Sequence, residues 1–411
     1  MAGWPGFIGT SMSLLTLVGF SLLYRELPVH EAGMMALLVS LSDILGLVAI
    51  LGLSTVITRL YSAAGPGVFD WRRDLGWTAS YLVPAIGLAA WGASRFYGFT
   101  AEIAVYLFIL TLLGALLGVT YSMLNSHGHY AWSAFLVRAP NSALIFPGLA
   151  GVWMAAGVRL GEALAVYLAA TLLALVTALV ILRHVLPAGP QRITARQRLN
   201  GAVFMATVAT DLLPDQGLIA VAGKILPISQ VAGFAAVAIL IRPFRLIRGI
   251  LAMILTPDLL RFRRASYRKL VAGIWTLAVG CGLTAAILIP PIAARFYGDR
   301  FQEAIQWIPT MALAGVLLVG VVPARADLTA RSPMRTMSWF ALVYAGSMVI
   351  SLALGITGML AWGAMFLPIT VVLLQATECG VGYSFWFAFR RRERNTRGAH
   401  KAAGIQAQSG D

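Results

Sequence analysis

Charged residues are scarce in this sequence. They make up 11% of its 411 residues, while 59% are hydrophobic and the mean hydropathy is +0.82. A soluble globular domain carries roughly twice that charged fraction, so the composition excludes one. Apolar runs of about 20 residues recur from end to end instead, the length that crosses a membrane as a helix. The sequence therefore predicts an all-α polytopic membrane protein.

Cysteines, catalytic motifs and large loops are also lacking. The two cysteines, Cys281 and Cys379, both lie in apolar runs, and no metal-ligand spacing occurs. The sequence has no glycine loop for nucleotide phosphates and no nucleophile elbow. The predicted outer loops are all short, whereas enzymes that polymerise or transfer lipid-linked sugars usually need a sizeable one. We therefore expect a protein that is not an enzyme and holds no cofactor.

Twelve apolar segments are predicted to span the membrane. The net charge of +15 would suggest nucleic acid in a soluble protein. Here most cations lie in short loops on one side and in the tail from Arg390, so we expect no nucleic acid partner and two cytoplasmic termini. The predicted spans are 5–24, 32–57, 77–94, 102–122, 135–156, 163–183, 200–222, 230–256, 270–293, 304–324, 338–356 and 359–389.

A short motif occurs twice. The sequence ASRFYG at 93–98 returns as AARFYG at 293–298, each time after the third span of its half. Two parallel six-helix lobes are typical of transporters that bind their substrate between the lobes near the membrane midplane. We predict an N-terminal lobe over 1–190, a C-terminal lobe over 195–390 and a basic cytoplasmic tail over 391–411.

Three arginines interrupt an apolar stretch over 228–255. Arg242, Arg245 and Arg248 follow one another at three-residue spacing, and apolar sequence resumes after them. An ionisable side chain inside the membrane is costly unless it faces a partner or a wet cavity, so it marks a substrate path by default. In an alternative interpretation, Pro243 ends the helix and the arginines reach the cytoplasmic interface.

Carboxylates also fall within apolar spans. Asp43 lies in the second span and Glu378 in the twelfth, while Asp211 and Asp215 flank Pro214 in the seventh. Each must be paired, protonated or hydrated. Asp211 and Asp215 could bind a coupling H⁺ or Na⁺ or hold the arginines between substrates, and Asp43 is a further candidate. A purely structural set of Asp–Arg pairs is the alternative, and Glu378 favours a structural role.

Five segments carry a resemblance to a known family. They are LLYREL at 22–27, EAGMMAL at 31–37, GLSTVITR at 52–59, TPDLLR at 256–261 and RFYGDRF at 295–301. In order and spacing, the chain resembles the polysaccharide-export (O-antigen) flippases of the multidrug/oligosaccharidyl-lipid/polysaccharide (MOP) exporter superfamily. The resemblance implies two six-helix lobes, alternating access and a central cavity lined by the first, second, seventh and eighth helices.

The resemblance also implies a function. We expect a flippase of the bacterial inner membrane that moves undecaprenyl-diphosphate-linked oligosaccharide, with Arg242, Arg245 and Arg248 binding the diphosphate because arginine matches phosphate oxygens. The polysaccharide polymerase or export proteins are expected partners. A cation-coupled multidrug or organic-solute antiporter of the same superfamily is the alternative. A membrane-embedded glycan polymerase and a structural subunit of a synthase complex also stay open.

Overall fold

The computed structural model describes residues 3–50, 52–64, 67–154, 157–199, 212–258, 264–332 and 334–408. Within these residues the chain is helical, and the single β contact is an isolated bridge between Phe69 and Gln191. Eight helical segments of this part are long and apolar enough to cross a membrane. The predicted all-α polytopic fold is therefore confirmed.

The helices before residue 190 pack against one another as an N-terminal bundle. Helix α5 lies at its centre and contacts α2, α3, α4, α6 and α8. The predicted span 32–57 is two helices, because Gly52 between them adopts a left-handed backbone conformation with φ 69°. The helices are α1 (Gly3–Glu26), α2 (Val29–Ile50), α3 (Leu53–Ala64), α4 (Trp71–Tyr97), α5 (Ala101–Ser126), α6 (Tyr130–Ala143), α7 (Ile145–Met154) and α8 (Leu160–Val185).

The helices after residue 212 form a C-terminal bundle. Helix α16 contacts α12, α13, α14 and α19, and α18 packs along α19. The elements are η1 (Leu213–Gly217), α11 (Leu218–Ile225), α12 (Ile228–Ile241), α13 (Pro243–Asp258), α14 (Arg264–Tyr297), η2 (Gly298–Phe301), α15 (Gln302–Ile305), α16 (Ile308–Gly320), α17 (Val322–Arg331), α18 (Met334–Trp362), η3 (Gly363–Met365) and α19 (Phe366–Gln408).

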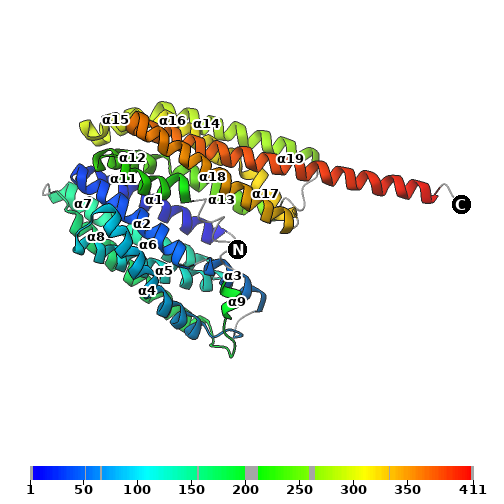
Figure 1. The fold of residues 1–411 in the computed structure, drawn as a ribbon, viewed down its shortest axis with the longest axis horizontal. Coiled ribbons are helices and arrows are strands. Elements are labelled where there is room, and N and C mark those ends of the chain that lie inside the picture. The colour runs from blue at the N-terminus through cyan, green and yellow to red at the C-terminus, as the bar shows by residue number, and fades with distance from the viewer. Residues whose placement is uncertain are drawn as a thin grey trace.

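The two bundles meet along α1 and α2. Helix α2 contacts η1, α11 and α12, and α1 contacts α12 and α13. Gly33 on α2 permits this approach, since a Cβ there would clash with the carbonyl oxygen of Ile228. The ribbons lie together around α11, α12 and α7, and they spread apart toward α3 and α9 on one side and α17 on the other (Figure 1). We call the first region the closed end of the molecule.

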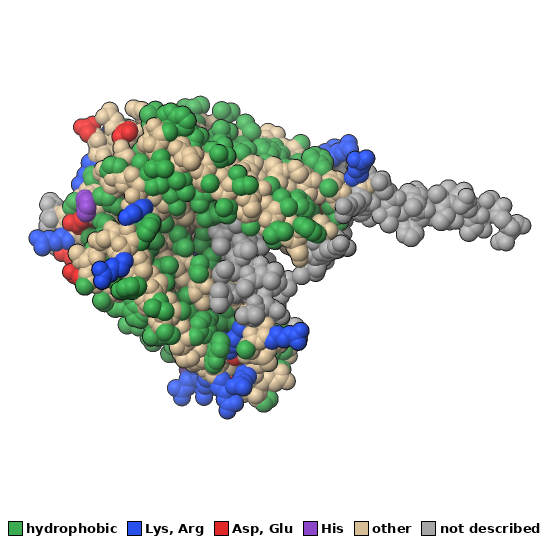
Figure 2. Space-filling view, viewed as in Figure 1, with side chains coloured by type: hydrophobic (Ala, Val, Ile, Leu, Met, Phe, Trp, Pro, Cys, Tyr) green, Lys and Arg blue, Asp and Glu red, His purple; other side chains and the backbone are tan. Residues whose placement is uncertain are grey.

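Charged side chains are absent from most of the face shown in Figure 2. Hydrophobic side chains cover the middle of that face, and the basic and acidic groups gather toward its ends. Many large apolar side chains are exposed, among them Leu88 (71%), Leu173 (67%) and Ile287 (68%). A soluble monomer rarely exposes so much apolar surface, so this surface fits contact with lipid tails.

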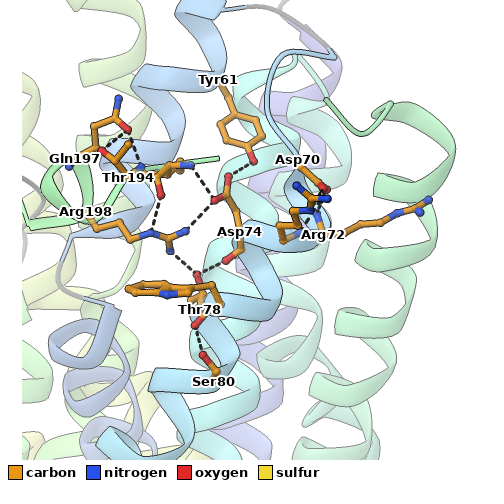
Figure 3. A network of polar contacts seen from close by, with 12 residues as sticks. Tyr61, Asp70, Arg72, Asp74, Thr78, Ser80, Thr194, Gln197 and Arg198 are labelled. Carbon is orange, nitrogen blue, oxygen red and sulfur yellow. Dashed lines mark hydrogen bonds and ion pairs between the residues drawn. The ribbon is translucent and has the colours of Figure 1, made fainter. Parts of the chain in front are cut away.

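The described first part of the segment that joins the bundles, up to residue 199, is bound to the N-terminal bundle. It includes the short helix α9 (Ala195–Leu199). Arg198 from this segment pairs with Asp74 on α4 at 2.8 Å (Figure 3). Its guanidinium also lies over the Trp77 ring, 3.9 Å from the centroid. Asp74 also accepts hydrogen bonds from the Ile193 backbone N–H at 3.0 Å and from the Tyr61 hydroxyl at 3.0 Å.

Removing Asp74 is expected to destabilise the protein. Its side chain is 1% exposed and that of Arg198 10% exposed, and breaking a buried pair by removing one partner costs about 3–5 kcal/mol. We expect Asp74→Ala to lower the midpoint of thermal unfolding of the purified protein. Arg73→Ala is the matched control. The Arg73 side chain is 72% exposed, so its ion pair with Asp70 contributes little to stability. Equal midpoints for the two variants would contradict this account.

Candidate functional site

A small cavity lies between the two bundles. The N-terminal bundle contributes Phe20, Tyr24, Ala36 and Val39 from α1 and α2. The opposite wall comes from η1, α11, α12 and the start of α13, and it consists of Asp215, Gln216, Ile219, Ala235, Ala238, Ile239, Arg242 and Arg245. The cavity measures about 40 Å³, which is room for one or two water molecules.

Arg242 stands at a break in the predicted eighth span. Helix α12 ends at Ile241 and α13 begins at Pro243, because proline cannot donate the backbone hydrogen bond that would continue the first helix. The alternative interpretation was therefore right about the break. The apolar sequence after the arginines forms the remainder of α13. Arg242 lies over the Phe20 ring of α1 at 5.0 Å, across the cavity.

Arg245 pairs with Asp215 at the edge of the same cavity. The pair joins α13 to η1, a single π-helical turn that begins next to Pro214. Such turns occur frequently at functional sites. The Asp215 side chain is 12% exposed and that of Arg245 is 42% exposed, so the arginine stays accessible while it is paired. Asp211, the second predicted carboxylate of this span, lies outside the described residues.

Asp43 lies next to the cavity without lining it. Its carboxylate accepts a hydrogen bond from the Gln216 side-chain amide, with 3.4 Å between Nε2 and Oδ2. Gln216 is itself a lining residue and lies beside Asp215 in η1. Asp43 on α2 thus contacts the residue that follows Asp215 in η1.

Arg248 points away from the cavity into the C-terminal bundle. Its guanidinium makes two hydrogen bonds to the Glu378 carboxylate of α19, at 2.8 and 3.3 Å. Arg325 of α17 binds the same carboxylate at 2.5 Å. Three residues along a helix turn the side chain by about 60°, so six residues turn it by about 120°. That rotation separates Arg248 from Arg242, and the predicted arginine set is divided between two sites.

Sequence reasoning missed the Arg248–Glu378–Arg325 cluster, which lies outside the cavity. Glu378 is 1% exposed and lies between the two arginines, an arrangement that fits the structural role predicted for it. Arg325 looked like one of the cations in a cytoplasmic loop. One signal in the sequence could have marked Arg325 as more than a loop residue. Asp327 follows two positions later, so two charges of opposite sign stand together at the end of an apolar run. The local sequence does not show that Arg325 pairs with Glu378 on α19.

Solved structures show what this architecture resembles. No protein-family model and no curated protein matches the chain. A lipid II flippase, MurJ, in an inward closed conformation is similar with a TM-score of 0.65 at 14% identity, over 94% of this chain and 87% of that one. An inward-facing multidrug resistance MATE family transporter of the MOP superfamily gives 0.60 at 13% identity, over 96% and 99%. An outward-facing one gives 0.56 at 13% identity, over 95% of both.

This chain has the fold of the MOP-superfamily transporters. The likeness covers nearly the whole chain and both bundles, so the predicted fold class is confirmed. Its structural neighbours are transporters and flippases and not enzymes, in keeping with the expectation from the short loops. At this level of identity the likeness concerns the fold alone. The resemblance to polysaccharide-export flippases remains a prediction from the sequence.

Proposed function

We propose that this protein is a flippase that moves a lipid-linked oligosaccharide across the bacterial inner membrane for polysaccharide export. The observation that carries the proposal is the pair of arginines, Arg242 and Arg245, on the wall of a cavity between two bundles of the MOP-transporter fold. Each guanidinium can bind phosphate oxygens through two parallel hydrogen bonds. A diphosphate linked to undecaprenol is the group that would use both.

The charge balance of the cavity supports an anionic substrate. Two arginines and one aspartate line it, which leaves a net positive charge, and the uncharged polar side chains Tyr24 and Gln216 complete its polar lining. Asp215 would hold Arg245 while no substrate is present, and the diphosphate would replace the carboxylate. The polyprenyl tail would stay in the bilayer, where the exposed apolar surface of the helices lies. Arg248 would act indirectly, by fixing α13 against α19.

Orientation and coupling belong to the same proposal. With both termini in the cytoplasm, the closed end of the molecule would face the periplasm, and the substrate would enter from the cytoplasmic side. Asp215 and Asp43 are the described carboxylates placed to take up a coupling H⁺ or Na⁺, since both lie at or beside the cavity. The enzymes that polymerise and export the sugar chain are the expected partners.

A cation-coupled multidrug or organic-solute antiporter is the second candidate. The MATE neighbours of the same fold favour it, as does the presence of acidic side chains at the cavity. The two cavity arginines argue against it, because they would repel a cationic drug from a site of low dielectric. The two candidates therefore differ in the sign of the charge that the cavity accepts.

Cells that lack this protein separate the two candidates. We expect lipid-linked oligosaccharide to accumulate in the cytoplasmic leaflet of such cells and to disappear again when the wild-type gene is restored. The measurement is extraction of the lipid-linked sugars, followed by a test of which leaflet holds them. Cells that accumulate no such lipid and become sensitive to cationic drugs would replace the flippase proposal with the antiporter.

A further inference from the structure

The duplicated sequence motif forms the same structure in both bundles. Helices α4 and α14 end at Tyr97 and Tyr297, and each is followed by a glycine with positive φ, 72° at Gly98 and 61° at Gly298. The adjacent aromatic rings meet edge to face in both copies, with centroids 5.0 Å apart at 80° in the first and 5.0 Å apart at 83° in the second. The cavity does not use either copy.

The first copy is held by the opposite bundle. Lys224 in the last turn of α11 lies 4.7 Å from the Phe96 ring, and its ammonium donates to the Phe96 carbonyl oxygen at 2.5 Å. The Tyr97 hydroxyl donates to the carbonyl oxygen of Ala220, also on α11, at 2.8 Å. A cation over an aromatic ring is attracted by the partial negative charge on the face of the ring. These contacts tie α4 of the N-terminal bundle to α11 of the C-terminal one.

The second copy makes the reverse connection. Arg25 in the last turn of α1 lies 5.3 Å from the Phe296 ring at the end of α14. Arg300, just after the motif, donates to the backbone carbonyl of Arg25. Arg25 also contacts Glu26 of its own helix at 3.5 Å. In each copy, then, a cation at the end of a helix in one bundle covers the phenylalanine of the motif in the other.

We propose that the two copies form a reciprocal latch, in which Lys224 on Phe96 and Arg25 on Phe296 hold the bundles together at the closed end. Both contacts lie at the surface, with Phe96 56% exposed and the Arg25 side chain 46% exposed. Water competes with such contacts, so each is weak and breaks readily. That suits a gate that must open once in each transport cycle, whatever the substrate is.

Release of the latch would open the closed end. Lys224 and Arg25 lie in the last turns of α11 and α1. The next helices of the two bundles, α12 and α2, begin with the close approach of Gly33 to Ile228. Proteins with this fold have been solved in inward-facing and in outward-facing conformations. The latch therefore sets the ratio of the two conformations and leaves the cavity unchanged.

Spin labels across the closed end test the latch without any substrate. Glu102 on α5 and Glu303 on α15 are both exposed, one in each bundle. They are replaced by labelled cysteines in a protein in which Cys281 and Cys379 are alanine, and the distance distribution is measured by pulsed electron paramagnetic resonance. We expect Phe96→Ala/Phe296→Ala to raise the ratio of long to short distances about five- to thirtyfold, the combined effect of two exposed cation–π contacts.

Two further variants make the test decisive. Arg25→Gln/Lys224→Gln removes the cations and keeps the rings, so it should give at least the same increase even if the phenylalanine variant fails to fold, since it also removes the hydrogen bond from Lys224 to the Phe96 carbonyl oxygen. Trp91→Ala is the matched control. It removes a cation–π contact of the same kind, that of Arg95 over the Trp91 ring at 5.8 Å, but both of these residues belong to α4 and so to one bundle. An unchanged distribution in the charge variant, or an equal shift in the Trp91→Ala protein, would overturn the latch. Neither result depends on the proposed substrate.

Discussion

Replacing Arg245 with alanine is expected to reduce export of the lipid-linked oligosaccharide to background while the protein level and its membrane insertion stay normal. A hydrogen bond to a charged group contributes about 1.5–3 kcal/mol, so the lost contact alone lowers diphosphate binding about ten- to a hundredfold. The side chain is 42% exposed, which makes its removal tolerable for folding. Export is measured as surface polysaccharide in cells that carry the variant in place of the wild type.

A double variant separates a binding role of Arg245 from a structural one. If Arg245 only neutralises Asp215, then Arg245→Ala/Asp215→Ala removes both charges and should restore export. If Arg245 binds the substrate, the double variant should stay inactive, because the diphosphate still lacks its partner. Arg72→Ala is the matched control, since Arg72 is exposed at the start of α4, far in sequence from the cavity residues. Normal export by Arg245→Ala itself would remove the basis of the proposal.

Replacing Glu378 with alanine is expected to have the largest effect on stability. Glu378 is 1% exposed and accepts hydrogen bonds from both Arg248 and Arg325, so its loss leaves two inward-pointing guanidinium groups without their shared carboxylate. Removing one member of such a buried set costs about 3–5 kcal/mol. We expect a clear fall in the thermal unfolding midpoint of the purified protein and a lower amount in the membrane.

A compensating change tests whether charge balance is the reason. Glu378→Ala/Arg325→Ala removes one charge of each sign, and neighbouring residues of one network are expected to show a strong interaction energy in such a cycle. The double variant should therefore be more stable than the two separate losses would predict. Strictly additive losses would show that Glu378 stabilises the bundle through packing alone. Arg248→Ala should also lower stability, in contrast to Arg245→Ala.

The sequence by itself determined the membrane-spanning character and the helical fold. Hydropathy is a local property, because each span needs only enough consecutive apolar residues to cross the bilayer with its own backbone hydrogen bonds satisfied. The end of α12 also has a local cause, because Pro243 follows it closely in the sequence and begins α13, although from the sequence alone this break was only the alternative interpretation. The repeated motif is local too, since its glycines at 98 and 298 permit the same turn in both halves. These features require no knowledge of which helices are neighbours.

Only the tertiary structure decided which charges share a site. The sequence shows three evenly spaced arginines, but it does not show that Arg245 meets Asp215 while Arg248 meets Glu378, which is 130 residues away. Such pairings depend on how the bundles pack, and the turn of α13 between positions 245 and 248 directs Arg245 to the cavity and Arg248 into the bundle. The cation–aromatic contacts between the bundles have the same origin. The repeated motif predicts its own turn, but the cation that covers its phenylalanine comes from a helix of the other bundle.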